Sequence, residues 1–472
     1  MAATVRFLQK IPPIAWIILV WAMAVLPNLT VRSFIWDEGI IAVIARDIVG
    51  HGKFLEPSVF GVRWCEEPAL LPWFIAATAR YTGGVHEWSA RLPSMLGVLV
   101  TSLFVFGLAR RHASEVAAFF AAGCFLFCPL LLQKLTIAEP DTVITAFSFA
   151  ALFCFRGRGQ PGRVDLLRWI VCGLLLSLCA LAKGPQPVAF FALGVGGYIL
   201  AGRRWNDLPG LVFCLLMPAG AVLIWGWMVY RPGDFSVWLG YMRIGNHLSR
   251  MDYILERFNF TGSLLLELIP ATFLVPFLFY RSGQVRTAGQ NELIRLLCWY
   301  AGAATLVLFF WTGARTRYAM PAAPAVAVLA GIAFDQIRHR SLLLGRVAVS
   351  ILAGLFLYQM ALVWVIMPVY ADRFGSTRTD GRIIDRILQP FSALPVFNVG
   401  GQDADELFYV NHPIRRIELC DAALIKPPAI LLIEPVVQAG LEKQRPDLNF
   451  QPLVRLTNGH HLIVVRVDSG GN

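Results

Sequence analysis

Side chains that could do chemistry recur at one kind of position in this sequence, at the ends of long apolar runs. Asp37 and Glu38 follow the first run, in the stretch SFIWDEGIIA. Four further polar residues border later runs: Asp141, Lys183, Arg317 and Tyr318. A carboxylate can orient or deprotonate a nucleophile, and cations can neutralise a leaving phosphate. The mixture of charges therefore favours a group-transfer site over a channel ring or a proton relay.

Each of these residues also has a purely structural interpretation. The Asp37–Glu38 pair and Asp141 could occupy first helical turns, where acidic groups complement the helix dipole. Lys183 could extend its ammonium to the membrane surface, and the Arg317–Tyr318 pair could anchor a span at head-group level. The sequence alone leaves both interpretations open.

The elements that must position these groups are membrane spans. With 472 residues, 57% hydrophobic residues and a mean hydropathy of +0.61, the chain is not an ordinary soluble domain. The net charge of +11 lies mostly in short loops between apolar runs, which argues against a nucleic-acid partner and for contact with membrane lipids. Hydropathy predicts spans at about 11–30, 92–109, 114–133, 142–156, 167–182, 186–202, 210–230, 262–280, 293–311, 318–336 and 344–369. The predicted fold class is an α-helical polytopic membrane protein with about eleven to thirteen transmembrane helices.

Basic residues predict the orientation of these spans. Arginines cluster in every second loop, and the positive-inside rule places those loops in the cytoplasm. The first span then reads as a retained signal-anchor, and the loops 31–91 and 231–261 face outwards. Within the first loop, PALLPWFIAATARY predicts a helix in the plane of the interface.

The last hundred residues change in character. LPVFNVGG, AILLIEP and HLIVVRV are short apolar stretches typical of buried strands, separated by polar segments. We therefore expect a transmembrane domain over residues 1–369, with its external loop at 31–91, and a small external α/β domain over residues 370–472.

The two external loops add further candidates for a shared site. The first loop contributes Arg63, Glu66 and Glu67, and the second contributes His247 and Arg250. Juxtamembrane charges that converge on one level of the membrane suggest a common function. Alternatively, the two glutamates are solvated loop charges, and His247 is a polar residue whose hydrogen bonds are satisfied within the protein.

The order of these motifs resembles the GT-C superfamily of membrane glycosyltransferases. The likeness is greatest to the bacterial branch that holds lipid A aminoarabinose transferase and relatives of the protein O-mannosyltransferases. It covers about residues 30–335, and the motifs that carry it beside Asp37 and Asp141 are VRWCEEPALLPWF, ARLPSMLGVLV, LAKGP and RYAMPAAPAVAVLAG.

The resemblance implies a function and roles for the residues. The family moves a sugar from a polyprenyl-phosphate donor, with inversion, to a lipid (lipid A-like) or glycan acceptor at the periplasmic face of the bacterial inner membrane. Asp37 and Asp141 match its catalytic acidic positions, and Glu66 with His247 would hold a divalent metal ion. The expected substrate-binding residues are Glu38, Arg63, Glu67, Lys183, Arg250, Arg317 and Tyr318.

One position departs from the family pattern. A lysine commonly precedes a proline pair there, but this chain has Glu67 followed by Pro68 and Ala69. Arg63 could replace the missing cation, the donor sugar could differ, or the alignment could shift by one residue. No particular sugar is therefore expected.

Two other functions compete with the enzyme. A transporter or flippase of lipid-linked sugars usually has repeated halves and a site at the membrane midplane. This sequence has no fixed-period repeat, and its charges lie towards one face. A non-catalytic scaffold would leave the ordered acidic residues of the first two external loops unexplained.

Overall fold

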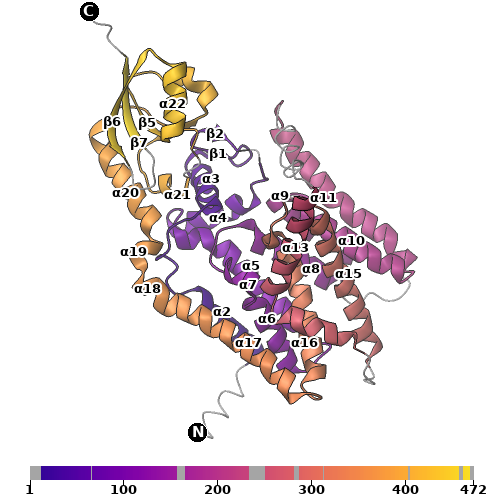
Figure 1. Cartoon of the computed structure of the whole chain (residues 1–472). Helices are drawn as coiled ribbons and strands as arrows, with labels where there is room; N and C mark the ends of the chain where they lie inside the picture. Colours follow the sequence, from indigo (N-terminus) through magenta and orange to yellow (C-terminus); the bar gives the residue numbers. More distant parts are fainter. Residues whose placement is uncertain are drawn as a thin grey trace, which may run out of the picture. The chain divides into compact units, whose positions relative to one another are not determined.

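A computed structural model describes residues 12–64, 66–156, 165–232, 250–280, 286–311, 313–401, 404–455 and 461–467 (Figure 1). Site candidate His247 lies outside these residues. The chain forms two compact units. The first comprises Met1–Leu29, Glu66–Leu71 and Arg91–Ile366, and the second comprises Thr30–Cys65, Pro72–Ala90 and Met367–Asn472.

The first unit is helical, and a helix lies at each predicted span. Its long helices are α2 (Pro13–Val25), α5 (Glu87–Arg110, whose residues 87–90 belong to the second unit), α6 (Glu115–Leu126), α8 (Pro140–Arg156), α9 (Leu166–Lys183), α10 (Gln186–Ala201), α11 (Leu208–Val229), α13 (Arg250–Glu267), α15 (Ala288–Phe310), α16 (Ala323–Ile337) and α17 (Leu342–Ala361). Its short helices are α7 (Pro129–Leu132), η1 (Trp205–Asp207), α14 (Ala271–Leu274), η2 (Val275–Leu278), η3 (Thr316–Ala322) and η4 (Leu362–Ile366).

Fewer helices than predicted reach spanning length. Within the described residues, six helices are long and apolar enough to cross a membrane, or seven if one bent pair is a single span. Three further apolar helices, α2, α6 and α10, are shorter. A straight crossing of the hydrocarbon core needs about 20 residues, and several predicted windows included loop residues to reach that length. The polytopic helical fold is confirmed, and the count of eleven to thirteen is not reached by this criterion.

The predicted span at 262–280 is wrong as a single straight helix. Helices Met251–Glu267 and Ala271–Leu278 meet at an angle of 94°, and Pro270 lies in the break between them. Proline has no backbone N–H and clashes with the preceding turn, so a helix rarely continues through it. This segment is a broken span or a re-entrant loop.

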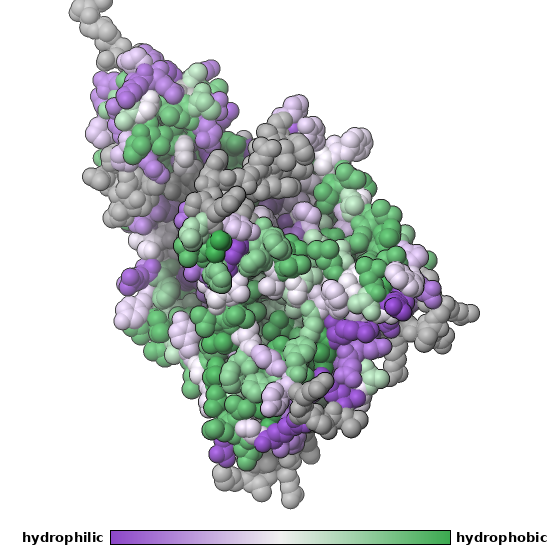
Figure 2. All heavy atoms as spheres, turned by 45° about the vertical axis from the view of Figure 1, so that its right-hand side comes forward, coloured by the Kyte–Doolittle hydropathy of each residue, from purple (hydrophilic) through white to green (hydrophobic). Residues whose placement is uncertain are grey.

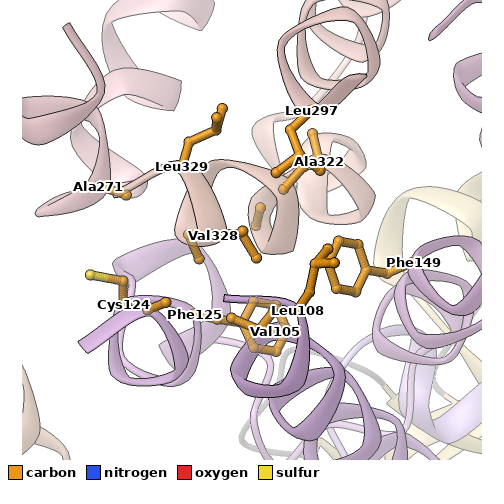
Figure 3. Close-up of a cluster of buried hydrophobic side chains, with 14 of the residues drawn as sticks. Val105, Leu108, Cys124, Phe125, Phe149, Ala271, Leu297, Ala322, Val328 and Leu329 are labelled. Atoms are coloured by element: carbon orange, nitrogen blue, oxygen red, sulfur yellow. The ribbon is translucent and has the colours of Figure 1, made fainter. Parts of the chain in front are cut away.

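Small residues let the helices of the first unit approach closely. A Cβ atom on Gly194 of α10 would lie 2.6 Å from the Tyr300 Cα atom of α15, so only glycine fits there. Such contacts are the usual basis of helix packing in membranes, where lipid removes the hydrophobic drive between helices. The resulting core takes side chains from helices throughout this unit, from α2 to α17. Figure 3 labels Val105, Leu108, Cys124, Phe125, Phe149, Ala271, Leu297, Ala322, Val328 and Leu329.

The outward faces of the same helices are apolar as well. Leu223 and Trp227 of α11 are 72% and 86% exposed, and Leu343 of α17 is 72% exposed. Figure 2 shows hydrophobic residues over much of the surface of this unit. An exposed apolar surface of this kind fits lipid, not water, which supports a membrane location for the first unit.

The second unit combines the first loop with the C-terminal region. The loop folds into α3 (Asp37–His51), a hairpin of β1 (Ser58–Val59) and β2 (Val62–Arg63), and α4 (Leu70–Thr82), which enters the unit at Pro72. The predicted helix at PALLPWFIAATARY is confirmed as α4, while its position along the interface stays a prediction. The C-terminal region begins with helices α18 (Met367–Val369), α19 (Ala371–Phe374), α20 (Ser376–Leu388) and η5 (Gln389–Phe391).

A five-stranded sheet completes the second unit. Its order is β4 (Ile414–Ile417), β3 (Val396–Val399), β5 (Ala429–Ile433), β7 (His461–Val467) and β6 (Leu448–Arg455), with β4, β3 and β5 parallel and the other pairs antiparallel. Helices α20 and α21 (Ala404–Leu407) supply apolar side chains to one face of the sheet. Turn η6 (Leu419–Leu424) and helix α22 (Pro435–Gln444) cover the other. The three predicted strands are confirmed as β3, β5 and β7, and the independence of a domain at 370–472 stays a prediction.

Candidate active site

Asp141 and Lys183 form a buried ion pair in the first unit. Asp141 lies in the first turn of α8, directly after Pro140, whose fixed φ suits the start of a helix. Lys183 is the last residue of α9, which ends because Gly184 adopts a φ of +85°. The Lys183 ammonium contacts Asp141 Oδ1, and the side chains are only 10% and 1% exposed. The structure thus brings together two residues that the sequence predicted to share a site.

A second buried cluster lies beside this pair. Lys134 Nζ donates to Glu139 Oε2 at 2.5 Å, and Arg317 Nη1 donates to the same oxygen at 3.3 Å. Burial raises the pKa of the Glu139 carboxyl, as does the neighbouring Asp141 carboxylate, while the Lys134 ammonium lowers it. Arg317 also lies within electrostatic range of Asp141. The two clusters therefore form one network of two carboxylates and three cations.

Tyr318, which follows Arg317 in turn η3, connects this network to helix α10. Lys183 Nζ lies 4.8 Å from the centre of the Tyr318 ring, a cation–π distance, and the Arg317 guanidinium lies 5.5 Å from it. Gln186 Nε2 donates to the Tyr318 carbonyl oxygen at 2.7 Å, and the Trp311 ring stacks on the tyrosine. These contacts fix turn η3 against the adjoining ends of α9 and α10.

The network retains unused acceptor capacity. Asp141 Oδ2, Glu139 Oε1 and the Thr142 hydroxyl are buried and have no hydrogen-bond partner among the described residues. Leaving such groups unpaired costs free energy, so they are rare in folded proteins except where a ligand, water or ion completes them. These atoms are the places where the network could receive a polar ligand.

Asp37 and Glu38 belong to the second unit and begin helix α3. Asp37 is exposed, whereas Glu38 is fully buried and its Oε2 accepts a hydrogen bond from the Ile35 backbone N–H at 3.3 Å. Both residues thus lie in the first turn of α3, as the structural interpretation predicts. The bond from Ile35 accounts for part of the hydrogen bonding of the Glu38 side chain. A catalytic role for Asp37 and a substrate-binding role for Glu38 stay predictions.

The other predicted residues are more dispersed. Arg63 lies half-buried on β2, Glu66 is half-buried and Glu67 exposed just before α4, and Glu67 acts electrostatically on Lys183. Helix α13 begins at Arg250, whose side chain lies outside the described part of the chain.

Within the described part of the chain, no cluster of three or more His, Cys, Asp or Glu side chains could hold a metal ion. Because His247 falls outside it, the predicted metal pair of Glu66 and His247 stays a prediction.

Lys134 and Glu139 were not among the predicted site residues. Both occur in the stretch KLTIAEPDT between two apolar runs. The sequence did not indicate that these residues are buried, with Lys134 only 6% and Glu139 only 3% exposed. A charged residue in a loop is normally expected to be solvated. The closeness of Glu139 to Asp141 was the available signal.

The chain shares its fold with a solved membrane-protein structure. The chain aligns with the crystal structure of ArnT from Cupriavidus metallidurans bound to undecaprenyl phosphate, with a TM-score of 0.72 and 18% identity over 98% of each chain. At this level of identity the likeness establishes the fold and nothing further. The predicted polytopic helical fold, with its small C-terminal α/β region, is confirmed, and it is similar to the fold of ArnT.

Sequence relatives point to the same class. Residues 66–227 match the family model of the dolichyl-phosphate-mannose-protein mannosyltransferases. The chain is 28% identical over 193 residues to the undecaprenyl phosphate-alpha-4-amino-4-deoxy-L-arabinose arabinosyl transferase of Enterobacter sp. (strain 638), covering 40% of this chain and 34% of the relative. For the enzyme of the same name from Pectobacterium atrosepticum the identity is 26% over 328 residues, covering 66% and 57%. The predicted resemblance is confirmed, and the chain spans only about a third to just over half the length of these relatives.

Proposed function

We propose that this protein is an inverting glycosyltransferase that uses a polyprenyl-phosphate-linked sugar. The acceptor would be a lipid, of the lipid A type, or a glycan at the periplasmic face of the inner membrane. The observation that carries the proposal is the network of Asp141, Lys183, Glu139, Lys134 and Arg317, in which every side chain but that of Arg317 is at most 10% exposed. Four of these residues lie within the segment that matches the mannosyltransferase family model.

The chemistry of the network suits a phosphate leaving group. An acceptor oxygen attacks the anomeric carbon, the bond from that carbon to the phosphate oxygen breaks, and polyprenyl phosphate departs with the bonding electrons. Lys183 and Arg317 would neutralise the departing phosphate, because hydrogen bonds between charged groups gain strength in a buried site. A carboxylate, for which we propose Asp37, would orient the acceptor and take its proton.

The surface of the first unit supports a lipid-linked donor. Exposed apolar side chains on α11 and α17 offer a lipid-facing environment in which a prenyl tail is soluble. ArnT from Cupriavidus metallidurans, which has a similar fold, was solved with undecaprenyl phosphate bound. Undecaprenyl phosphate is therefore the first donor carrier to test. The sugar stays open, because Glu67 stands where a cation is common.

The test is transfer of radiolabelled sugars from a panel of undecaprenyl-phosphate donors to lipid acceptors by the purified protein. The proposal predicts a labelled acceptor and stoichiometric release of undecaprenyl phosphate for at least one donor. Movement of intact lipid-linked sugar across liposomes, without any transfer, would contradict it and favour a flippase.

A further inference from the structure

The segment that leads into Asp37 is held by the C-terminal region of the same unit. Ser33 donates from both its backbone N–H and its hydroxyl to the Phe374 carbonyl oxygen, at 3.0 and 3.1 Å. The Phe34 N–H donates to the Tyr409 hydroxyl oxygen at 2.9 Å, and the Phe34 ring packs edge-on against Phe408 at 4.8 Å. Residues 341 and 375 positions further along the chain therefore fix the backbone just before Asp37.

Tyr409 is the centre of a small polar network. Its hydroxyl donates to Glu87 Oε1 at 3.0 Å, and Arg378 Nε donates to the same oxygen at 2.8 Å. Arg378 Nη2 also donates to the Thr30 carbonyl oxygen. A tyrosine hydroxyl is protonated at neutral pH, and burial and the Glu87 carboxylate raise the pKa of the Tyr409 phenol further above its ordinary value. It can thus accept from Phe34 and donate to Glu87 at the same time.

Helix α3 itself is docked on the same region (Figure 1). A Cβ atom on Gly39 would lie 2.3 Å from the Asp405 backbone nitrogen, so the two backbones are in direct contact. About two turns further along α3, Arg46 Nη1 donates to the Phe408 carbonyl oxygen at 2.7 Å, with its guanidinium 4.9 Å from the Phe408 ring centre. Contacts to the C-terminal region thus lie on both sides of Asp37 in the sequence.

Between these fixed points the backbone is strained. Trp36, the residue that precedes α3, has φ +50° and ψ −126°, a conformation that a side chain with a Cβ atom rarely adopts. Strain of this kind persists only where the surroundings hold it in place. The bonds at Ser33 and Phe34 before Trp36, and the packing of Gly39 after it, provide that restraint.

We propose that Tyr409, held by Glu87 and Arg378, is a positioning residue for Asp37. It acts through the backbone at Phe34 and sets the direction in which Asp37 leaves the strained turn. The inference rests on the proposed glycosyltransferase function for its kinetic consequence. It assigns the C-terminal region a part in building the turn that carries Asp37.

The substitution Tyr409→Phe tests this, because it removes one oxygen and keeps the ring packed on Phe34 and Phe408. We expect kcat for transfer to fall about tenfold to a hundredfold, as for a displaced catalytic group, with the donor KM changed less than about twofold. Amide hydrogen exchange at residues 33–40 should speed up, while exchange in strand β5 should not. Tyr81→Phe is the matched control, since Tyr81 is 92% exposed, and it should behave as the wild type.

Several results would overturn the proposal. One is a wild-type kcat in Tyr409→Phe, and another is a fall in kcat with unchanged exchange at 33–40. If Tyr409→Phe fails to fold, Glu87→Gln keeps the acceptor oxygen but weakens the pair with Arg378, and it must reproduce the kcat and exchange effects. If the wild type transfers no sugar, the proposed function fails, yet the exchange measurement still decides whether Tyr409 holds the turn.

Discussion

At the scale of single residues, the ion pair of Asp141 and Lys183 affects both the stability of the protein and its proposed function. A fully buried carboxylate is tolerated here because an ammonium contacts it, although one of its oxygens lacks a partner among the described residues. Breaking a buried pair strands one charge, whereas replacing both charges can be neutral. Stability and catalysis can therefore be separated by comparing single and double substitutions.

The substitution Lys183→Met should destabilise the protein by about 3–5 kcal/mol, because it removes the ammonium that contacts the buried Asp141 carboxylate and leaves only the more distant Arg317 to offset its charge. The double variant Asp141→Asn with Lys183→Met should recover most of that loss and still transfer no sugar. Thermal denaturation in detergent and the transfer assay together measure both effects. A double variant with wild-type transfer would remove this pair from the mechanism.

At the scale of elements, close helix contacts set the positions of the site residues. Helix α10 carries Gln186, which bonds Tyr318, at one end, and it packs on α15 through Gly194. Displacing α10 would therefore disturb η3 as well. In membranes such small-residue contacts replace much of the stabilisation that apolar burial gives in water.

We expect Gly194→Ala to destabilise the protein by about 1–3 kcal/mol, because its new methyl group would overlap the Tyr300 backbone. Gly220→Ala in α11 is the control, since nothing lies within 4 Å of the position of its added Cβ. That change should be neutral or slightly stabilising, as alanine has the higher helix propensity. Equal melting temperatures for the two variants would contradict the close packing of α10 on α15.

The elements also show what the sequence could and could not predict. Hydropathy located the helices and the apolar strands β3, β5 and β7, because burial leaves a direct pattern in residue type. It missed β4, whose sequence is IRRI, and β6, which contains Pro452, because their residues are not typical of buried strands. It also missed the break at Pro270, where composition stayed apolar although the helix turned.

The candidate site was predictable only in part, for a related reason. Charges at span ends predicted that Asp141 and Lys183 share one level of the membrane, and they are in contact. The pairing of Glu139 with Arg317 joins residues 178 positions apart, and that of Tyr409 with Glu87 joins residues 322 apart. No local periodicity encodes such contacts, which depend on how the elements pack.

At the scale of the whole molecule, the proposal requires one orientation in the membrane. The chain is a multi-pass membrane protein, and the basic loops predict that Asp37 and the C-terminal region face the periplasm. Cys420 can report on this, because it is the exposed cysteine among those that the structure describes.

A membrane-impermeant maleimide added to intact spheroplasts should modify the peptide that contains Cys420. The variant Cys420→Ser should lose that modification and keep any transfer activity. Modification that requires prior permeabilisation of the membrane would place the C-terminal region in the cytoplasm and contradict the proposed orientation.

The most direct test of the central claim compares the wild type with Asp37→Asn in the transfer assay. The measurement uses the radiolabelled undecaprenyl-phosphate donor that the wild type accepts, with monodisperse elution as the check of folding. Asp421→Asn, at an exposed position of η6, is the matched control. We predict transfer by the wild type and by Asp421→Asn, and a loss of at least about a hundredfold in Asp37→Asn, the scale on which general acid–base catalysis contributes. Equal transfer by all three proteins would contradict it.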